Sequence, residues 1–279
     1  MVDHDEQRQV DREVSRRKAL KAAGIGGSAV ALAFAGLFGE DVVNAQTAGD
    51  DPQTILNLGA TAEGLAITAF HSIITQSRFF ERLAPHYQAY LRSALTQEQA
   101  HYDLWVASGA RPLANRFFFP DGILENLALY VFVTDVLEGT FIGAYLAATR
   151  RFAELNRPDL AWTVASVMGI EAEHKALNRA MGITQANSAT PGDRISASPT
   201  REPFEPATLF QVSQAVPTLG PVLTGGTAPA SAGRLVAGVN FGVGPVTQPG
   251  AEAVRNVGNP LTTVPPPLRA FNRAGRRLF

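Results

Sequence analysis

The sequence predicts an all-α protein: a four-helix bundle followed by a Pro/Gly-rich, mostly irregular C-terminal extension. Four segments between residues 51 and 181 place apolar side chains at steps of three and four. No segment alternates apolar and polar residues with period two, and 13 of the 18 prolines lie in residues 184–279. A bundle is the simplest architecture for about 130 residues that contain four such segments.

The first two helices are predicted for residues 51–80 and 85–108. Asp51 stands directly before a proline, which favours the start of a helix. Pro85 is placed in the same way at the start of the second helix, and Gly109 is expected to end it. The few residues between them are expected to form a tight turn, so that these helices make an antiparallel hairpin.

The third and fourth helices are predicted for residues 121–155 and 159–181. Asp121 is expected to open the third helix, and Gly182 is expected to end the fourth. A turn at residues 156–158 joins them into a second hairpin. The bundle would then occupy residues 46–183 as one domain.

The connection between the two hairpins contains the segment LANRFFFP, with three consecutive phenylalanines. We expect these rings to cap the bundle or to join an interface rather than face water. About 12 residues at 3.3 Å each are just long enough for this connection to run the length of the bundle.

Residues 1–45 are predicted to be a twin-arginine signal segment. Arg16 and Arg17 precede an apolar run at residues 22–38, and small residues precede a cleavage position after Ala45. The expected location is therefore the periplasm, the cell surface or the extracellular space, with transient contact with the export machinery. A run of about 17 residues is at the lower limit for spanning a bilayer, so a membrane anchor formed by an uncleaved signal stays an alternative.

The prolines and glycines of residues 184–279 argue against a packed domain. Extended segments along the bundle, an oligomer contact and disorder are all compatible with this composition, so a homo-oligomer is left open. With 24 basic and 25 acidic residues the net charge is −1, and nucleic acid is not an expected partner. The absence of cysteine excludes disulfides, iron–sulfur clusters and thiolate zinc sites. Any metal must therefore be bound by carboxylate and imidazole.

Two of the predicted helices contain the same metal-binding pattern. Glu98 is followed three residues later by His101, and Glu171 is followed by His174. Residues three apart on an α-helix are separated by about 60° around the axis and about 4.5 Å along it, so both can bind one ion.

The other two helices each place one glutamate, Glu63 or Glu138, among apolar residues. An ionised carboxylate on a core face is costly unless it is paired or bound to a metal. Glu63 and Glu98 are 35 residues apart, Glu138 and Glu171 are 33 apart, and each pair is centred within about one helical turn of its predicted hairpin turn. Four glutamates and two histidines from four helices make up the ligand set of di-iron and di-manganese bundles.

Four segments, ATAEGLAITAF, EQAHYDLW, LEGTFIGAYLAA and GIEAEHKAL, resemble the exported ferritin-like domain proteins, a family that includes plant desiccation-related proteins. The similarity covers about residues 50–183. It implies a ferritin-like bundle with a two-metal carboxylate site, most often assumed to contain iron. Many relatives have a second acidic residue soon after the first in helix one, and LAITAF has none; we expect this departure to alter the surroundings of the site rather than its ligands. Carried over position by position, the metal ligands would be Glu63, Glu98, His101, Glu138, Glu171 and His174.

In such a site Glu98 and Glu171 would bridge two ions. One ion would be completed by Glu63 with His101 and the other by Glu138 with His174, and this pairing is open to exchange. Carboxylate and imidazole suit two iron ions or, alternatively, two manganese ions.

Three further residues near the ligands were considered. Tyr145 lies seven residues after Glu138 on the same helix face. It is expected to be either a neighbour of the site, with a radical-quenching or hydrogen-bonding role, or a core tyrosine. His71 is two turns beyond Glu63, too far to bind the same ion, and is expected to be a packing or rim residue. Glu173 points away from the ligand face and is expected to face solvent.

The sequence therefore predicts a dinuclear metal protein with redox activity toward Fe(II), dioxygen or peroxide, in oxidative or desiccation stress. As an enzyme it would resemble a di-iron oxidase or ferroxidase, or a manganese catalase. The alternatives are a non-catalytic metal-binding or stress-protective protein and a surface interaction protein, in both of which the metal site is structural.

Overall fold

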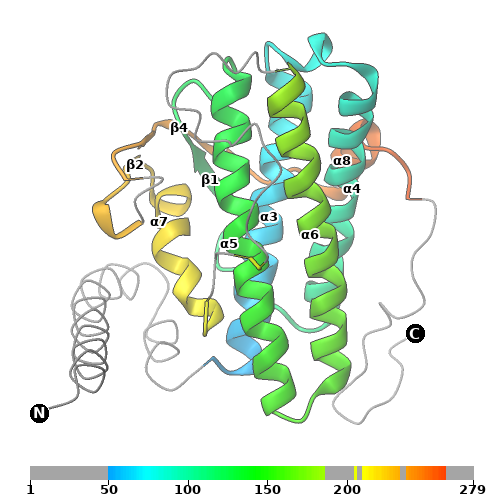
Figure 1. Cartoon of the computed structure of the whole chain (residues 1–279), viewed down its shortest axis with the longest axis vertical. Coiled ribbons are helices and arrows are strands. Elements are labelled where there is room, and N and C mark those ends of the chain that lie inside the picture. The colour runs from blue at the N-terminus through cyan, green and yellow to red at the C-terminus, as the bar shows by residue number, and fades with distance from the viewer. Residues whose placement is uncertain (1–49, 186–203, 206–208, 233–236, 262–279) are drawn as a thin grey trace, which may run out of the picture.

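The computed structural model describes residues 50–185, 204–205, 209–232 and 237–261 (Figure 1). The predicted signal segment at residues 1–45 lies outside the described residues. The predicted boundary between the bundle and the extension remains a prediction.

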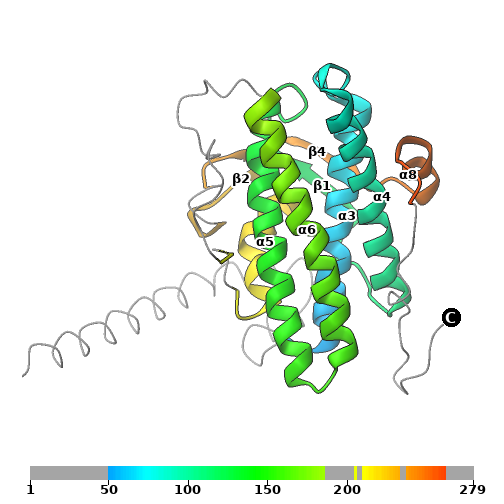
Figure 2. The same cartoon turned by 45° about the vertical axis from the view of Figure 1, so that its right-hand side comes forward.

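Four long helices form the bundle (Figures 1 and 2), which confirms the predicted all-α architecture. Helix α3 packs against α4, with the short helix η1 (Phe80–Arg82) between them, and α5 packs against α6. The two hairpins then pack on each other, α3 on α5 and α4 on α6. The four helices are α3 (Pro52–Gln76), α4 (Pro85–Ala107), α5 (Leu127–Glu154) and α6 (Pro158–Gln185).

Local sequence explains most of the helix ends. Asp51 caps α3 by accepting a hydrogen bond of 2.8 Å from the backbone nitrogen of Thr54. In the turn between α5 and α6, Asn156 adopts φ 54°, a left-handed conformation that asparagine tolerates better than most residues. Pro158 then opens α6.

Three predicted helix ends are wrong. Helix α3 ends at Gln76 and not near residue 80, because the backbone of Ser77 is extended. Helix α5 does not begin at Asp121: its N-cap is Asn126, because Gly122 has φ 79° and interrupts a right-handed helix before that point. Helix α6 does not end at Gly182 but continues to Gln185, whose side chain accepts a hydrogen bond of 3.1 Å from the backbone of Ala84.

The connection from α4 to α5 runs along α3 from one end of the bundle to the other. At one end the carbonyl of Gly109 accepts a 2.9 Å hydrogen bond from the side chain of Gln53, near the start of α3. At the other end the carbonyl of Leu124 accepts a 2.8 Å hydrogen bond from the backbone nitrogen of Arg78, just after α3. In Figure 1 the α3–α4 turn is at the top and the α5–α6 turn is at the bottom, so α4 and α5 point the same way.

The three phenylalanines of this connection lie in a strand. The sequence did not predict this strand, because apolar and polar residues do not alternate there. Strand β1 (Arg116–Phe119) pairs antiparallel with β4 (Val243–Thr247) of the extension. Phe117 and Phe119 are buried, so the rings do leave water as expected, against the side of the bundle. The pair contains an irregularity where Gly244 has φ 128°, and a Cβ there would lie 2.7 Å from the carbonyl oxygen of Phe117. Only glycine fits this approach.

The described part of the extension packs on the bundle, although its composition argued against packing. Helices η2 (Val212–Ala215) and α7 (Val216–Thr224) cover α3, α5 and β1, and α8 (Ala251–Val257) lies on α3 and α4. Strands β2 (Gly226–Thr227) and β3 (Asn240–Phe241) form a second small sheet, with η3 (Ala230–Ala232) between them. Val212, Val222, Phe241 and Val254 of the extension belong to the same core as the bundle.

Helix α5 lies in the centre of this core. By length and composition alone it is the one helix among the described residues that would suit a membrane span, with a mean hydropathy of 1.5 over 18 residues. In the structure 67% of that window is buried against the rest of the chain, as expected for the core helix of a bundle.

Candidate metal centre

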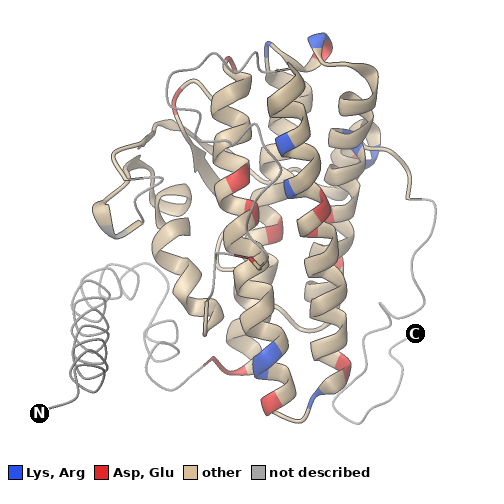
Figure 3. Ribbon diagram, in the orientation of Figure 1, with Lys and Arg blue, Asp and Glu red and all other residues tan. Residues whose placement is uncertain are grey.

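The structure brings all six predicted ligands together in the interior of the bundle. Figure 3 shows a band of acidic positions at mid-height on the bundle helices. Each of the six side chains is buried, with at most 5% of its surface exposed. They come from all four helices: Glu63 from α3, Glu98 and His101 from α4, Glu138 from α5, and Glu171 and His174 from α6.

The six residues form two groups of four with two members in common. In each group one ligand atom per residue lies within 4.8 Å of every other. Glu98 and Glu171 belong to both groups, as bridging ligands of a two-metal site must. The first group is Glu63, Glu98, His101 and Glu171, and the second is Glu98, Glu138, Glu171 and His174.

Each histidine turns its Nδ1 atom toward both shared glutamates. Nδ1 of His101 lies 3.3 Å from Glu98 Oε2 and 3.3 Å from Glu171 Oε1. Nδ1 of His174 lies 3.0 Å from Glu98 Oε1 and 3.5 Å from Glu171 Oε2. The two imidazoles therefore face the same pair of carboxylates, one in each group.

The donor set fits metal ions because many of its atoms have no other partner. Among the described residues, five carboxylate oxygens of the cluster are buried without a hydrogen-bond donor, and the short approach of His174 Nδ1 to Glu98 lacks hydrogen-bond geometry. Buried oxygen atoms of this kind are costly unless a cation binds them. The five oxygens are Glu63 Oε2, Glu98 Oε1, Glu138 Oε2 and both Oε atoms of Glu171.

A comparison with protein families identifies the helical region. Residues 51–183 match the family model of the ferritin-like domain. This segment is a ferritin-like domain. No curated protein and no solved structure matches the chain.

The electrostatics of the ferritin-like domain show how much negative charge its centre concentrates. Burial, followed by the charges of Glu171 and Glu98, raises the pKa of Glu63 well above its usual range. Burial and the charge of Glu171 raise the pKa of Glu138 in the same way. Burial also acts against charge on Glu98, but the nearby imidazole of His174 outweighs it and lowers the pKa of Glu98. Without a cation the cluster must retain protons, and bound metal ions would replace them.

Both histidines compensate part of this charge. Burial alone would lower the pKa of His101, but the close carboxylates of Glu171, Glu63 and Glu98 outweigh burial and raise the pKa well above its usual value. For His174, burial is likewise outweighed, first by the charge of Glu98.

Gln97 is a contact of the centre that sequence reasoning missed. Its Oε1 lies 2.9 Å from Nε2 of His174, and because an amide oxygen only accepts, Nε2 must donate. This contact leaves Nδ1 of His174 directed at the shared carboxylates, as the ring nitrogen from which a metal would displace the proton. Gln97 carries no pattern of its own, because its partner lies 77 residues away on another helix.

Tyr145 and Trp105 contact the centre at Glu63, whereas Gln97 contacts it at His174. The hydroxyl of Tyr145 donates to Glu63 Oε1, and Nε1 of Trp105 lies 3.3 Å from the same oxygen and 3.3 Å from the Tyr145 hydroxyl. Both donors bind Oε1, and Oε2 of Glu63 is left to face the cluster. Tyr145 is thus a hydrogen-bonding neighbour of the centre, one of the two alternatives that its position suggested. Trp105 was not predicted, although it follows His101 by one helical turn.

The two remaining residues lie where the sequence suggested. His71 is half-buried and is in neither four-residue group, and burial lowers its pKa. Glu173 is exposed on α6.

Proposed function

We propose that the ferritin-like domain binds two metal ions and performs redox chemistry on small inorganic substrates. The observation that carries this proposal is the pair of overlapping four-residue groups that share Glu98 and Glu171. We propose iron as the metal and manganese as the alternative, because both suit a site of carboxylates and imidazoles. The proposed substrates are Fe(II), dioxygen and peroxide.

The six residues have distinct proposed roles. Glu98 and Glu171 would each bind both ions, because they belong to both groups. Glu63 and His101 would complete the binding of one ion, and Glu138 and His174 that of the other. Ions held in this way supply one-electron chemistry and open coordination positions for an oxidant.

The residues around the ligands keep this geometry in place. Tyr145 and Trp105 donate hydrogen bonds to one oxygen of Glu63, which fixes the rotamer of that carboxylate. Gln97 fixes the orientation of His174. Burial of all six ligands excludes bulk water and strengthens the electrostatic contacts between them.

Metal analysis of isosteric variants tests the site. The purified chain should contain about two iron or manganese ions. Glu98→Gln and Glu171→Gln should each lose both ions, because each residue serves both groups, whereas Glu63→Gln and Glu138→Gln should each retain about one. Glu173→Gln, an exposed glutamate on the same helix as Glu171, is the matched control and should keep both. Equal metal content in all five variants would refute the site.

Turnover separates the proposed redox function from a structural role. The metal-loaded protein should oxidise Fe(II) with dioxygen or peroxide, or decompose peroxide if it contains manganese. Two bound ions without either activity would instead favour the non-catalytic, stress-protective alternative.

We also propose that the protein is exported by the twin-arginine route and acts in oxidative or desiccation stress. The export proposal rests on Arg16, Arg17 and the apolar run at residues 22–38, and the stress role rests on the resemblance to a family that includes desiccation-related proteins. Replacing both arginines by lysine should retain the protein in the cytoplasmic fraction. Unchanged export of that variant would contradict the proposal.

A further inference from the structure

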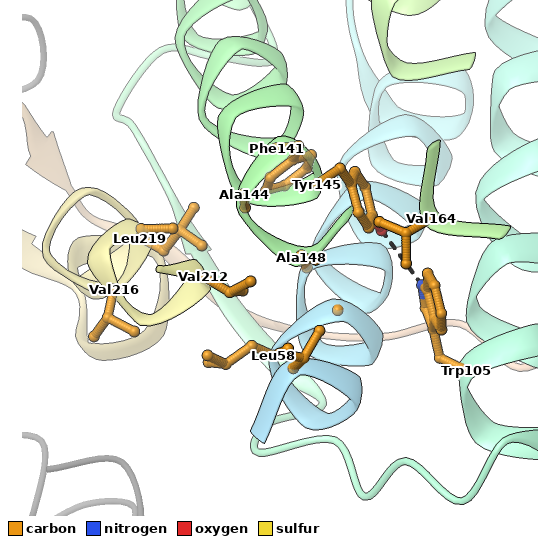
Figure 4. Close-up of a pocket in the computed structure, with 14 residues that line it drawn as sticks. Leu58, Trp105, Phe141, Ala144, Tyr145, Ala148, Val164, Val212, Val216 and Leu219 are labelled. Atoms are coloured by element: carbon orange, nitrogen blue, oxygen red, sulfur yellow. Dashed lines mark hydrogen bonds between the residues drawn. The ribbon is translucent and has the colours of Figure 1, made fainter. Parts of the chain in front are cut away.

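An apolar cavity lies beside the metal centre, between the bundle and the C-terminal extension (Figure 4). Leu58 of α3, Ala144 of α5 and Leu219 of α7 line three of its sides. Trp105 and Tyr145 line the side toward the centre. The cavity is therefore separated from Glu63 by the two side chains that bind this glutamate.

The residues that line the cavity offer almost no free hydrogen-bonding groups to a polar ligand. Their side-chain hydrogen-bonding groups are the Tyr145 hydroxyl and Nε1 of Trp105, and both are already engaged with Glu63. A buried water needs two to four polar partners, and apolar cavities without them stay dry. Peroxide is also polar, so it would lack hydrogen-bond partners in this cavity in the same way. The chemistry of the lining therefore selects a small apolar molecule.

The volume of the cavity also limits the size of the ligand. The cavity has about 30 Å³ of free space, whereas one water molecule needs roughly 10–15 Å³ and an engineered cavity that binds benzene has about 150 Å³. There is room for a diatomic gas and too little for an aromatic ring.

A second apolar cavity of about 20 Å³ lies next to the first beneath α7. The two share Leu58, Ala62, Val216 and Leu219 as lining residues. The second extends to Phe117 of β1. The two cavities therefore lie side by side beneath α7, the first reaches Trp105 and Tyr145, and residues of the extension line both.

We propose that this cavity binds dioxygen and delivers it to the side of the metal centre formed by Glu63 and His101. The inference rests on the proposed function, because it names dioxygen rather than peroxide as the oxidant of that same site. It also gives the extension a role, since residues of α7 line both cavities.

The glycines of the bundle offer a matched pair of variants. Gly59 lines the cavity, and a Cβ at this position would lie 3.5 Å from Nε1 of Trp105, an ordinary contact distance. Gly59→Ala should thus fold normally while it narrows the cavity. Gly169→Ala on α6 is the control: its Cβ would meet nothing within 4 Å, and it makes the same gain in helix propensity.

The test uses crystals of the full chain under xenon pressure and steady-state kinetics of the metal-loaded protein. Xenon should occupy the cavity in the parent protein and in Gly169→Ala, and its affinity should fall about tenfold in Gly59→Ala because a methyl group fills part of the space. The KM for dioxygen should rise by a similar factor in Gly59→Ala at unchanged metal content, and the KM for peroxide should not change.

The outcomes separate this inference from the proposed function. An absence of xenon from the parent cavity, or an unchanged KM for dioxygen in Gly59→Ala, would overturn the inference and leave the metal centre intact. Xenon in the cavity of a metal-loaded protein that consumes peroxide but no dioxygen would overturn the delivery role and leave the proposed redox function intact. Absence of bound metal from the purified parent protein would overturn the proposed function and, with it, the delivery role.

Discussion

At the scale of single residues, the contact between Gln97 and His174 has the most direct consequence for metal binding. Gln97→Leu removes the acceptor for Nε2, so the imidazole can rotate or protonate at Nδ1. Metal affinity should fall about 10- to 100-fold, the usual effect of losing such an outer contact. Competition with a chelator measures the change.

A conservative variant at the same position distinguishes orientation from packing. Gln97→Glu keeps an oxygen acceptor beside Nε2 and should retain most of the affinity. If Gln97→Leu and Gln97→Glu weakened binding equally, the orienting role of Gln97 would be wrong.

The six proposed ligands could be predicted from the sequence, but the contacts that support them could not. Two Glu-x-x-His steps and two glutamates among apolar residues can be recognised within single helices, because helical geometry alone places each pair on one face. The contacts of Gln97 and Trp105 each join different helices. Such contacts depend on how helices are rotated in the bundle, which local periodicity does not determine.

At the scale of elements, the start of α5 depends on Asn126. Its side chain accepts a 3.1 Å hydrogen bond from the backbone nitrogen of Leu129. Asn126→Ala should lower the free energy of unfolding by about 1 kcal/mol, measured by denaturant titration. Glu125→Ala, at the exposed neighbouring residue, is the control and should change it little. An equal loss in both variants would contradict the capping role.

Helix ends were predicted well where local chemistry decides them and poorly where distant contacts do. Asp51 was identified as a cap because its carboxylate serves its own helix. Asp121 has the same chemistry but binds the side chain of Asn240 in the extension at 2.7 Å. The last turn of α6 is held beyond Gly182 by a 2.8 Å hydrogen bond between Thr184 and Tyr87 of α4.

At the scale of the whole molecule, the extension is part of the structure that stabilises the bundle. A chain that ends at residue 185 loses the cover of α7 and the partner strand of β1. It also loses the backbone donors of Val212 and Ser213 that bind the buried carboxylate of Asp50. We expect its free energy of unfolding to fall by at least about 3 kcal/mol, the effect of exposing one or two large apolar side chains.

Denaturant unfolding of the truncated and full chains, both free of metal, measures this difference. A midpoint shared by the two chains would show that the bundle folds independently of the extension.

The packing of the extension could not be predicted from its proline content because prolines are compatible with short helices at some positions. Helix α7 accommodates one proline in its first turn, where the missing N–H has no helical partner, and a second at Pro221. Its apolar residues meet a surface assembled from α3, α5 and β1. That surface exists only after the bundle has folded, so no local sequence pattern indicates it.

The pairing of β1 with β4 also orders the assembly of the chain. Each helical hairpin joins neighbours in sequence, whereas the strand pair joins Phe119 to Val243 and encloses all of α5 and α6 in the loop between them. Contacts between distant residues form slowly, because the entropy of closing a long loop is lost before the contact is gained. We therefore expect the hairpins to associate first and the strands to join last. The ligands would meet while the side of the bundle is still open, and metal would enter before the extension closes over it.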